Sequence, residues 1–133
     1  MDDTTSPDAI EDGLRAAAVA MTAPDDGECV FCYVLRMLDD FGCDTTLRWA
    51  PRWRDLRMPR ATGLERRLGA RGGFCDCEIF LNGWNLVEEL QTRDENGDLR
   101  WPRERLVCAG ARFSQPCTNW EKRRRPRHWW EWS

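Results

Sequence analysis

Residues 28–43 read ECVFCYVLRMLDDFGC, a stretch that combines a helical apolar pattern with three cysteines. Its large apolar side chains return every three or four residues, at Phe31, Val34, Leu35, Leu38 and Phe41. This spacing places them on one face of a helix. Gly42 follows as the expected C-terminal residue, where the chain leaves the helix. We therefore predict a helix over about 28–41 that buries one face in a core.

Other segments of the chain carry weaker signals of secondary structure. Ser6 and Pro7 predict the start of an earlier helix that ends before Pro24. Two shorter helices are expected, from Pro51 to before Pro59 and from about Gly63 to Ala70. Strands are expected at 74–81, 86–92, 99–101 and 105–109, with Asn96-Gly97 as a hairpin turn and an irregular chain from Ser114. The predicted fold class is α+β, with N-terminal helices followed by a small antiparallel sheet.

The 133 residues are enough for one domain, and their charge is unevenly distributed. The net charge of −3 conceals an acidic head and two basic segments. Residues 1–28 carry eight acidic groups and one arginine, whereas 46–72 carry eight arginines and two acidic groups. We expect an acidic N-terminal segment with one helix over 1–28, an α+β core over 29–113 and a basic, Trp-rich tail over 114–133.

Five of the seven cysteines fall between positions 29 and 77. Cys29 and Cys32 form a C-x-x-C pair at a helix start, where both thiols share a face and the thiolate is favoured. Cys75 and Cys77 form a C-D-C pair after two glycines. We expect these four to be the ligands of a structural zinc ion, with Cys43 as the substitute if the C-D-C pair cannot chelate.

Two alternatives to zinc stay open: buried thiols without a ligand, and a redox pair. On an extended strand Asp76 would point away from the thiols into solvent. Cys108 and Cys117 belong to no spaced motif, and we expect a buried strand cysteine and a loop cysteine.

The cysteine motifs resemble a known family. C-x-x-C-Y, then RMLDDFGCDTTLRW, and later GGFCDCEIFLN are similar to the bacterial domain-of-unknown-function family DUF 2695, over roughly Cys29 to Asn82. The resemblance implies a fold and a motif, because members have no assigned activity. Family members usually carry histidine directly after the G-C-D triplet, where this chain has Thr45. If that histidine is a metal ligand in relatives, metal binding here must rest on cysteines alone.

The sequence lacks the catalytic or binding residues that several classes of enzyme require. The single histidine, His128, lies five residues from the C-terminal end, so the body of the chain has no imidazole for a triad or a Cys-His pair. Phosphate-binding glycine motifs are also missing from the sequence. We therefore predict that the protein is not an enzyme.

Two segments interleave cations with indoles, the combination that binds single-stranded nucleic acid. The first segment supplies Arg48, Trp49, Arg52, Trp53 and Arg54. The tail supplies Lys122, Arg123, Arg124, Arg125, Arg127, Trp129, Trp130 and Trp132. The alternative for the first segment is an amphipathic helix whose two tryptophans pack in the core.

Taken together, the sequence predicts a small cytoplasmic binding or adaptor module that acts by macromolecular contact. A protein is the expected partner, and the alternative function is a nucleic-acid-binding accessory protein. No apolar run approaches the ~20 residues of a membrane helix, so no membrane association is expected.

Overall fold

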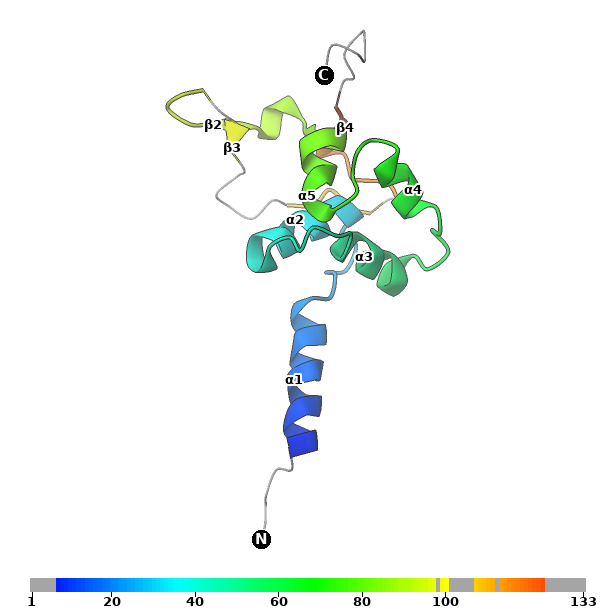
Figure 1. The fold of residues 1–133 in the computed structure, drawn as a ribbon. Coiled ribbons are helices and arrows are strands. Elements are labelled where there is room, and N and C mark those ends of the chain that lie inside the picture. The colour runs from blue at the N-terminus through cyan, green and yellow to red at the C-terminus, as the bar shows by residue number, and fades with distance from the viewer. Residues whose placement is uncertain (1–6, 98, 101–106, 112, 124–133) are drawn as a thin grey trace.

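The computed structural model describes residues 7–97, 99–100, 107–111 and 113–123 (Figure 1). Its helices are α1 (Pro7–Met21), α2 (Val30–Phe41), α3 (Trp49–Arg57), α4 (Leu64–Gly69) and α5 (Asp76–Glu78), with the π-helical turn η1 (Ile79–Gly83) and the 3-10 turn η2 (Glu88–Leu90). Its strands are β1 (Trp84–Leu86), β2 (Thr92–Arg93), β3 (Leu99–Arg100) and β4 (Trp120–Lys122). The fold class is confirmed, with helices in the majority and little sheet.

The strands form two antiparallel pairs rather than one sheet. β1 pairs with β4, so that Leu86 lies opposite Trp120. β2 pairs with β3 across the Asn96-Gly97 turn, in which Gly97 has φ +83°. The predicted Asn-Gly turn is confirmed, and its positive φ is a conformation that glycine adopts without strain. The strand expected at 86–92 is wrong over most of its length, because the 3-10 turn η2 lies within it and only its ends reach β1 and β2.

Helix α2 lies at the centre of the core and packs against α3. Phe31 on α2 contacts Phe80, Trp84 and Trp120 edge to face, with ring centroids 5.9, 4.7 and 6.0 Å away. These rings join α2 to η1, β1 and β4. Because each buried aromatic side chain contributes a large apolar area, this cluster supplies much of the driving force for folding.

The prediction of a strand over 74–81 is wrong, since this segment forms α5 and η1. Its buried side chains follow a helical spacing, with Asp76, Ile79 and Phe80 inside and Phe74 and Leu81 exposed. Asp76 is fully buried instead of pointing into solvent.

The buried Asp76 carboxylate caps a helix from elsewhere in the chain. Arg48 is the N-cap residue of α3, and its own side chain makes no capping hydrogen bond. Instead, Oδ2 of Asp76 accepts from the backbone N–H groups of Arg48 (2.9 Å) and Trp49 (3.0 Å), and Oδ1 accepts from that of Ala50 (3.3 Å). A carboxylate at a helix N-terminus also meets the positive end of the helix dipole. Burial raises the pKa of Asp76, and these three N–H groups oppose that rise.

The expectation of an irregular chain from Ser114 is also wrong, because β4 forms there. Trp120 is buried, and Arg123 donates to the carbonyl oxygen of Phe80 at 3.0 Å. The packed core therefore extends past residue 113. Of the expected strand at 105–109, positions 105 and 106 lie outside the described residues, and 107–109 lie in no strand.

Helix α1 projects away from the packed elements (Figure 1). Its C-terminal end is held to the core, since the carbonyl oxygen of Thr22 accepts from Oη of Tyr33 (2.6 Å) and Nε of Arg52 (3.2 Å). Within the described parts of the chain, no helix is both long and apolar enough to cross a membrane.

We predict that Asp76→Ala lowers the free energy of unfolding by about 2 kcal/mol, since three helical N–H groups lose their acceptor. Urea denaturation measures this loss. Glu78→Ala is the control, because it removes the same charge from the same helix without touching the cap. Equal losses for the two variants would contradict the capping role.

Candidate metal centre

Cys29 and Cys32 lie at the N-terminal end of α2. Cys29 is the capping residue, with extended backbone (φ −74°, ψ 163°), and its sulfur accepts from the backbone N–H of Cys32 at 3.4 Å. Both side chains are buried. The thiol of Cys29 therefore takes the place that a serine or aspartate oxygen usually occupies at a helix start.

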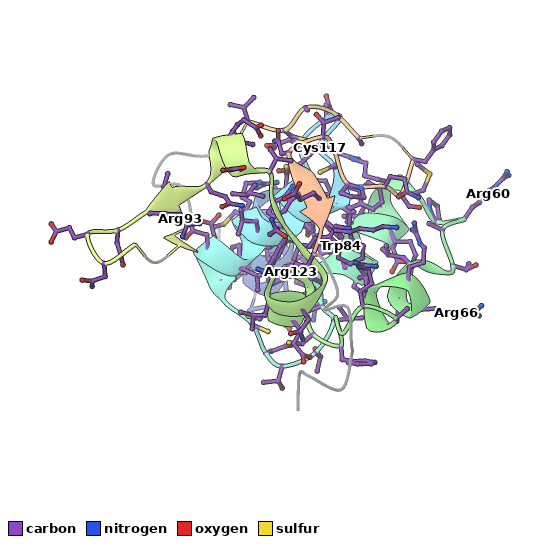
Figure 2. The ribbon with its side chains drawn as sticks, turned by 90° about the horizontal axis from the view of Figure 1, so that it is seen from above. Arg60, Arg66, Trp84, Arg93, Cys117 and Arg123 are labelled. Atoms are coloured by element: carbon purple, nitrogen blue, oxygen red, sulfur yellow. The ribbon has the colours of Figure 1, made fainter. Side chains whose placement is uncertain are left out.

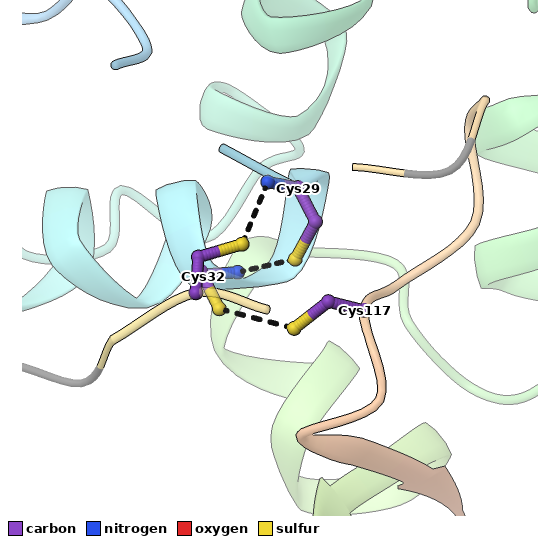
Figure 3. A group of neighbouring side chains, drawn as sticks. Cys29, Cys32 and Cys117 are labelled. Carbon is purple, nitrogen blue, oxygen red and sulfur yellow. Dashed lines mark hydrogen bonds between the residues drawn. The ribbon is translucent and has the colours of Figure 1, made fainter. Parts of the chain in front are cut away.

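Two cysteines from the far end of the chain meet this pair. Cys108 Sγ accepts from the backbone N–H of Cys29 at 3.2 Å, and Cys117 Sγ lies 3.7 Å from Cys32 Sγ. All four sulfur atoms lie within 4.8 Å of one another. Figure 3 shows Cys29 and Cys32 on the first turn of α2, with Cys117 reaching toward them from the chain that leads into β4. We call Cys29, Cys32, Cys108 and Cys117 the four-thiol cluster.

Hydrogen bonds to sulfur surround the four-thiol cluster. Two of these bonds are given above: Cys32 N–H donates to Cys29 Sγ, and Cys29 N–H donates to Cys108 Sγ. In addition, Gly110 N–H donates to Cys108 Sγ (3.3 Å) and Trp120 Nε1 donates to Cys32 Sγ (3.3 Å). Donors aimed at sulfur stabilise the thiolate form, and such outer partners orient the ligands in metal sites.

The thiols differ in acidity. The hydrogen bond from the Cys32 thiol, against the opposing effect of burial, lowers the pKa of Cys29 to about 5. The same bond and burial raise the pKa of Cys32. Burial raises the pKa of Cys117 to about 11. Cys29 is therefore the most acidic of these three thiols.

The donor set fits a metal ion. A tetrahedral zinc site with zinc–sulfur distances of about 2.3 Å needs sulfur atoms about 3.8 Å apart. The 3.7 Å separation between Cys32 and Cys117 is close to that value. The four clustered cysteines could hold a metal ion.

The structure brings together only half of the ligand set expected from the sequence. Cys75 and Cys77 flank the buried Asp76 of α5, and Cys43 follows the C-terminal end of α2. Cys29 and Cys43 are separated by the length of that helix, about 20 Å at 1.5 Å per residue. The C-D-C pair and Cys43 are thus outside the four-thiol cluster.

Cys108 and Cys117 were not expected as ligands. They follow no C-x-x-C spacing, and their place depends on the pairing of β4 with β1, which the sequence pattern does not indicate. The odd number of cysteines, seven, is the one feature of the sequence that indicates further thiols in the metal site.

The two tryptophans of the first Arg/Trp segment are not exposed to solvent. Trp49 and Trp53 are each 1% exposed, and their Nε1 atoms donate to the carbonyl oxygens of Gly42 (3.2 Å) and Glu28 (2.9 Å). Their packing in the core is the alternative that the sequence left open, and neither ring can stack on a base. Arg52 contacts the end of α1, and Arg54 pairs with Glu65. The exposed Arg48 stacks its guanidinium on Trp49, 4.1 Å from the ring.

Of the basic tail, Lys122 is exposed on β4 and Arg123 bonds the Phe80 carbonyl. Figure 2 shows Arg123 near Trp84, whereas Arg60 and Arg66 point outward on the side of α4. The other expected contact residues lie outside the described residues: Arg124, Arg125, Arg127, Trp129, Trp130 and Trp132.

These features define a class: a small α+β protein with a buried all-cysteine cluster that could hold a metal ion. Comparison with known protein families identifies the family to which the chain belongs. Residues 30–82 match the family described as "Protein of unknown function (DUF2695)". Uncharacterised proteins of Mycobacterium bovis and Mycobacterium tuberculosis are 35% identical over 77 residues, which cover 56% of this chain and 78% of each relative. The chain belongs to the DUF2695 family. No solved structure matches it.

We predict that cobalt(II), a spectroscopic probe for thiolate ligands, binds the four-thiol cluster. Cys117→Ser should weaken cobalt binding at least about 10-fold, because loss of a ligand costs no less than loss of an outer partner. Titration followed by sulfur-to-cobalt absorption measures this change. Cys75→Ser is the control and should bind as the parent does. A larger loss in Cys75→Ser than in Cys117→Ser would contradict the assignment.

Proposed function

We propose that the protein is a small non-catalytic binding module whose fold is closed by a structural zinc ion at the four-thiol cluster. The observation that carries this proposal is the convergence of four sulfur atoms within 4.8 Å from segments about 80 residues apart. Sites with four cysteine ligands are structural, because no coordination position remains for a substrate or a water.

The position of the four-thiol cluster supports this role. It ties the start of α2 to residues 107–123, in which β4 is the only described regular element and spans three residues. A strand pair of this length is marginal by itself. One ion that joins the segment to α2 would therefore contribute directly to folding, on the order of 10 kcal/mol.

Helix α1 supports contact with a macromolecule. Its apolar side chains recur at helical spacing and stay uncovered, with Ile10 52%, Leu14 66% and Met21 62% exposed. Its other face carries Asp8, Glu11 and Asp12 beside the single Arg15. An amphipathic helix of this kind binds in a groove through its apolar face. The charge favours a protein partner whose groove is apolar and whose rim is basic.

The zinc part of the proposal predicts one zinc ion per chain in protein purified under reducing conditions. A chelator should then lower the thermal unfolding midpoint by more than 10 °C or unfold the protein, since roughly 4 kcal/mol or more is lost. Calorimetry with metal analysis measures both effects.

Cys29→Ser serves as the matched variant. It should contain little zinc and should show no further change with chelator. Reduced protein that contains no metal, and whose unfolding the chelator does not change, would contradict the structural zinc.

The contact part of the proposal predicts that a photo-crosslinking residue at position 14 captures one protein partner in the cells that produce this protein. The same residue at exposed position 60, between α3 and α4, is the control. Purified cross-linked partner should bind the full chain, and Leu14→Ser should weaken that binding about 10-fold, as expected for removing a buried apolar side chain. Cross-links only between copies of this chain, or equal capture at both positions, would contradict the proposal.

A further inference from the structure

An open groove of about 490 Å³ lies beside the four-thiol cluster. One wall comes from the turn between α1 and α2, and the other comes from residues 107–110, which include Cys108. Cys108 is partly exposed, whereas Cys29, Cys32 and Cys117 are buried. Cys108 is therefore the member of the cluster that a solute in this groove would meet first.

The groove is acidic. Asp25 and Asp26 are exposed on one wall beside the buried Glu28, and no lining residue that the structure describes is basic. Arg36 pairs closely with Glu28, at 2.7 Å, but it lies 3.9 Å from Asp25, and Arg57 lies 3.9 Å from Asp26. Because ion pairs of exposed side chains at such distances are weak, the two aspartates keep a negative field toward the solvent. A groove lined by one sign of charge raises the local concentration of the opposite ion.

Cys108 is attached differently from the other three thiols. It lies in the segment 107–111, which forms neither helix nor strand. Ala111 N–H of this segment donates to the carbonyl oxygen of Gly27 at 2.6 Å, and the side chain of Asn119 donates to the segment's first carbonyl oxygen at 2.7 Å. The other three thiols come from the first turn of α2 and from the buried chain before β4. Local opening of the segment would thus move Cys108 without unfolding α2 or β4.

We propose that this groove is the route by which a divalent cation enters and leaves the four-thiol cluster, with Cys108 as the ligand that opens. The proposal rests on the metal site proposed above. On entry, the Cys108 thiol gives its proton to water, and a lone pair of its sulfur replaces one water molecule bound to the cation. On release, a water molecule takes that place and the sulfur is protonated again. A path to the ligands is one of the requirements of a metal site.

The test measures how fast cobalt(II) binds to and leaves the reduced full chain, followed by sulfur-to-cobalt absorption after rapid mixing. Ala109→Phe places a ring in the groove. It should slow binding and release severalfold and by the same factor, with an unchanged Kd, because it obstructs the path and removes no ligand. Ala111→Phe is the matched control, since Ala111 is exposed in the same segment and is not among the residues that line the groove.

The charge of the groove gives a second readout. Replacing Asp25 and Asp26 together by asparagine should slow cobalt binding about 10-fold at low salt. The difference from the parent should shrink as salt screens the charges. The control replaces the exposed Asp39 and Asp40 on α2 by asparagine, which removes the same charge away from the groove, and it should bind cobalt at the parent's rate.

Alkylation of the reduced, metal-free chain tests the groove without any ion. Iodoacetamide should modify Cys108 faster than the other three thiols of the cluster, and Ala109→Phe should slow that reaction. The tryptic peptides 106–112, 113–122 and 16–36 separate Cys108 from Cys117 and from the two cysteines of α2.

The outcomes distinguish the route from the metal site. Unchanged cobalt rates in Ala109→Phe, or slower alkylation of Cys108 than of the other cluster thiols, would overturn the route and leave the metal site standing. A parent chain that binds no cobalt would overturn both.

Discussion

The approach of Cys108 and Cys117 to the start of α2 is the contact on which the rest of the core depends. It places the chain before β4 so that Trp120 can contact Phe31 and Phe80 and so that β4 can pair with β1. The hydrogen bond to Cys29 and burial raise the pKa of Cys32, and burial raises that of Cys117, whereas the pKa of Cys29 is lowered to about 5. A divalent cation held by the four-thiol cluster would favour the thiolate form of its sulfurs, which is the reason for proposing zinc there.

The two ends of α2 therefore have different chemistry. At its N-terminal end the thiols are buried and bonded by N–H groups, an arrangement suited to a closed structural site. Cys43, beyond its C-terminal end, is partly exposed, as are Cys75 and Cys77 on either side of the Asp76 cap.

Much of the helical part could be predicted from the sequence, because its signals are local. The apolar spacing in 28–41, Pro7 at a helix start and the Asn-Gly turn each act within a few residues, and the elements formed as expected. The strand expected at 74–81 failed because the short segment also fits a helix, and the cap that Asp76 gives to α3 decides between them. In the same way, C-x-x-C located half of the four-thiol cluster. The other half depends on long-range pairing of β4, which no local spacing indicates.

A zinc ion at the four-thiol cluster should be coordinated by sulfur alone. X-ray absorption at the zinc edge, measured on the purified full chain, reports the type, number and distance of the atoms bound to zinc. We expect a first shell of four sulfur atoms at about 2.3 Å, with no nitrogen or oxygen. A first shell that contains nitrogen or oxygen ligands, or fewer than four sulfurs, would contradict the closed four-cysteine site.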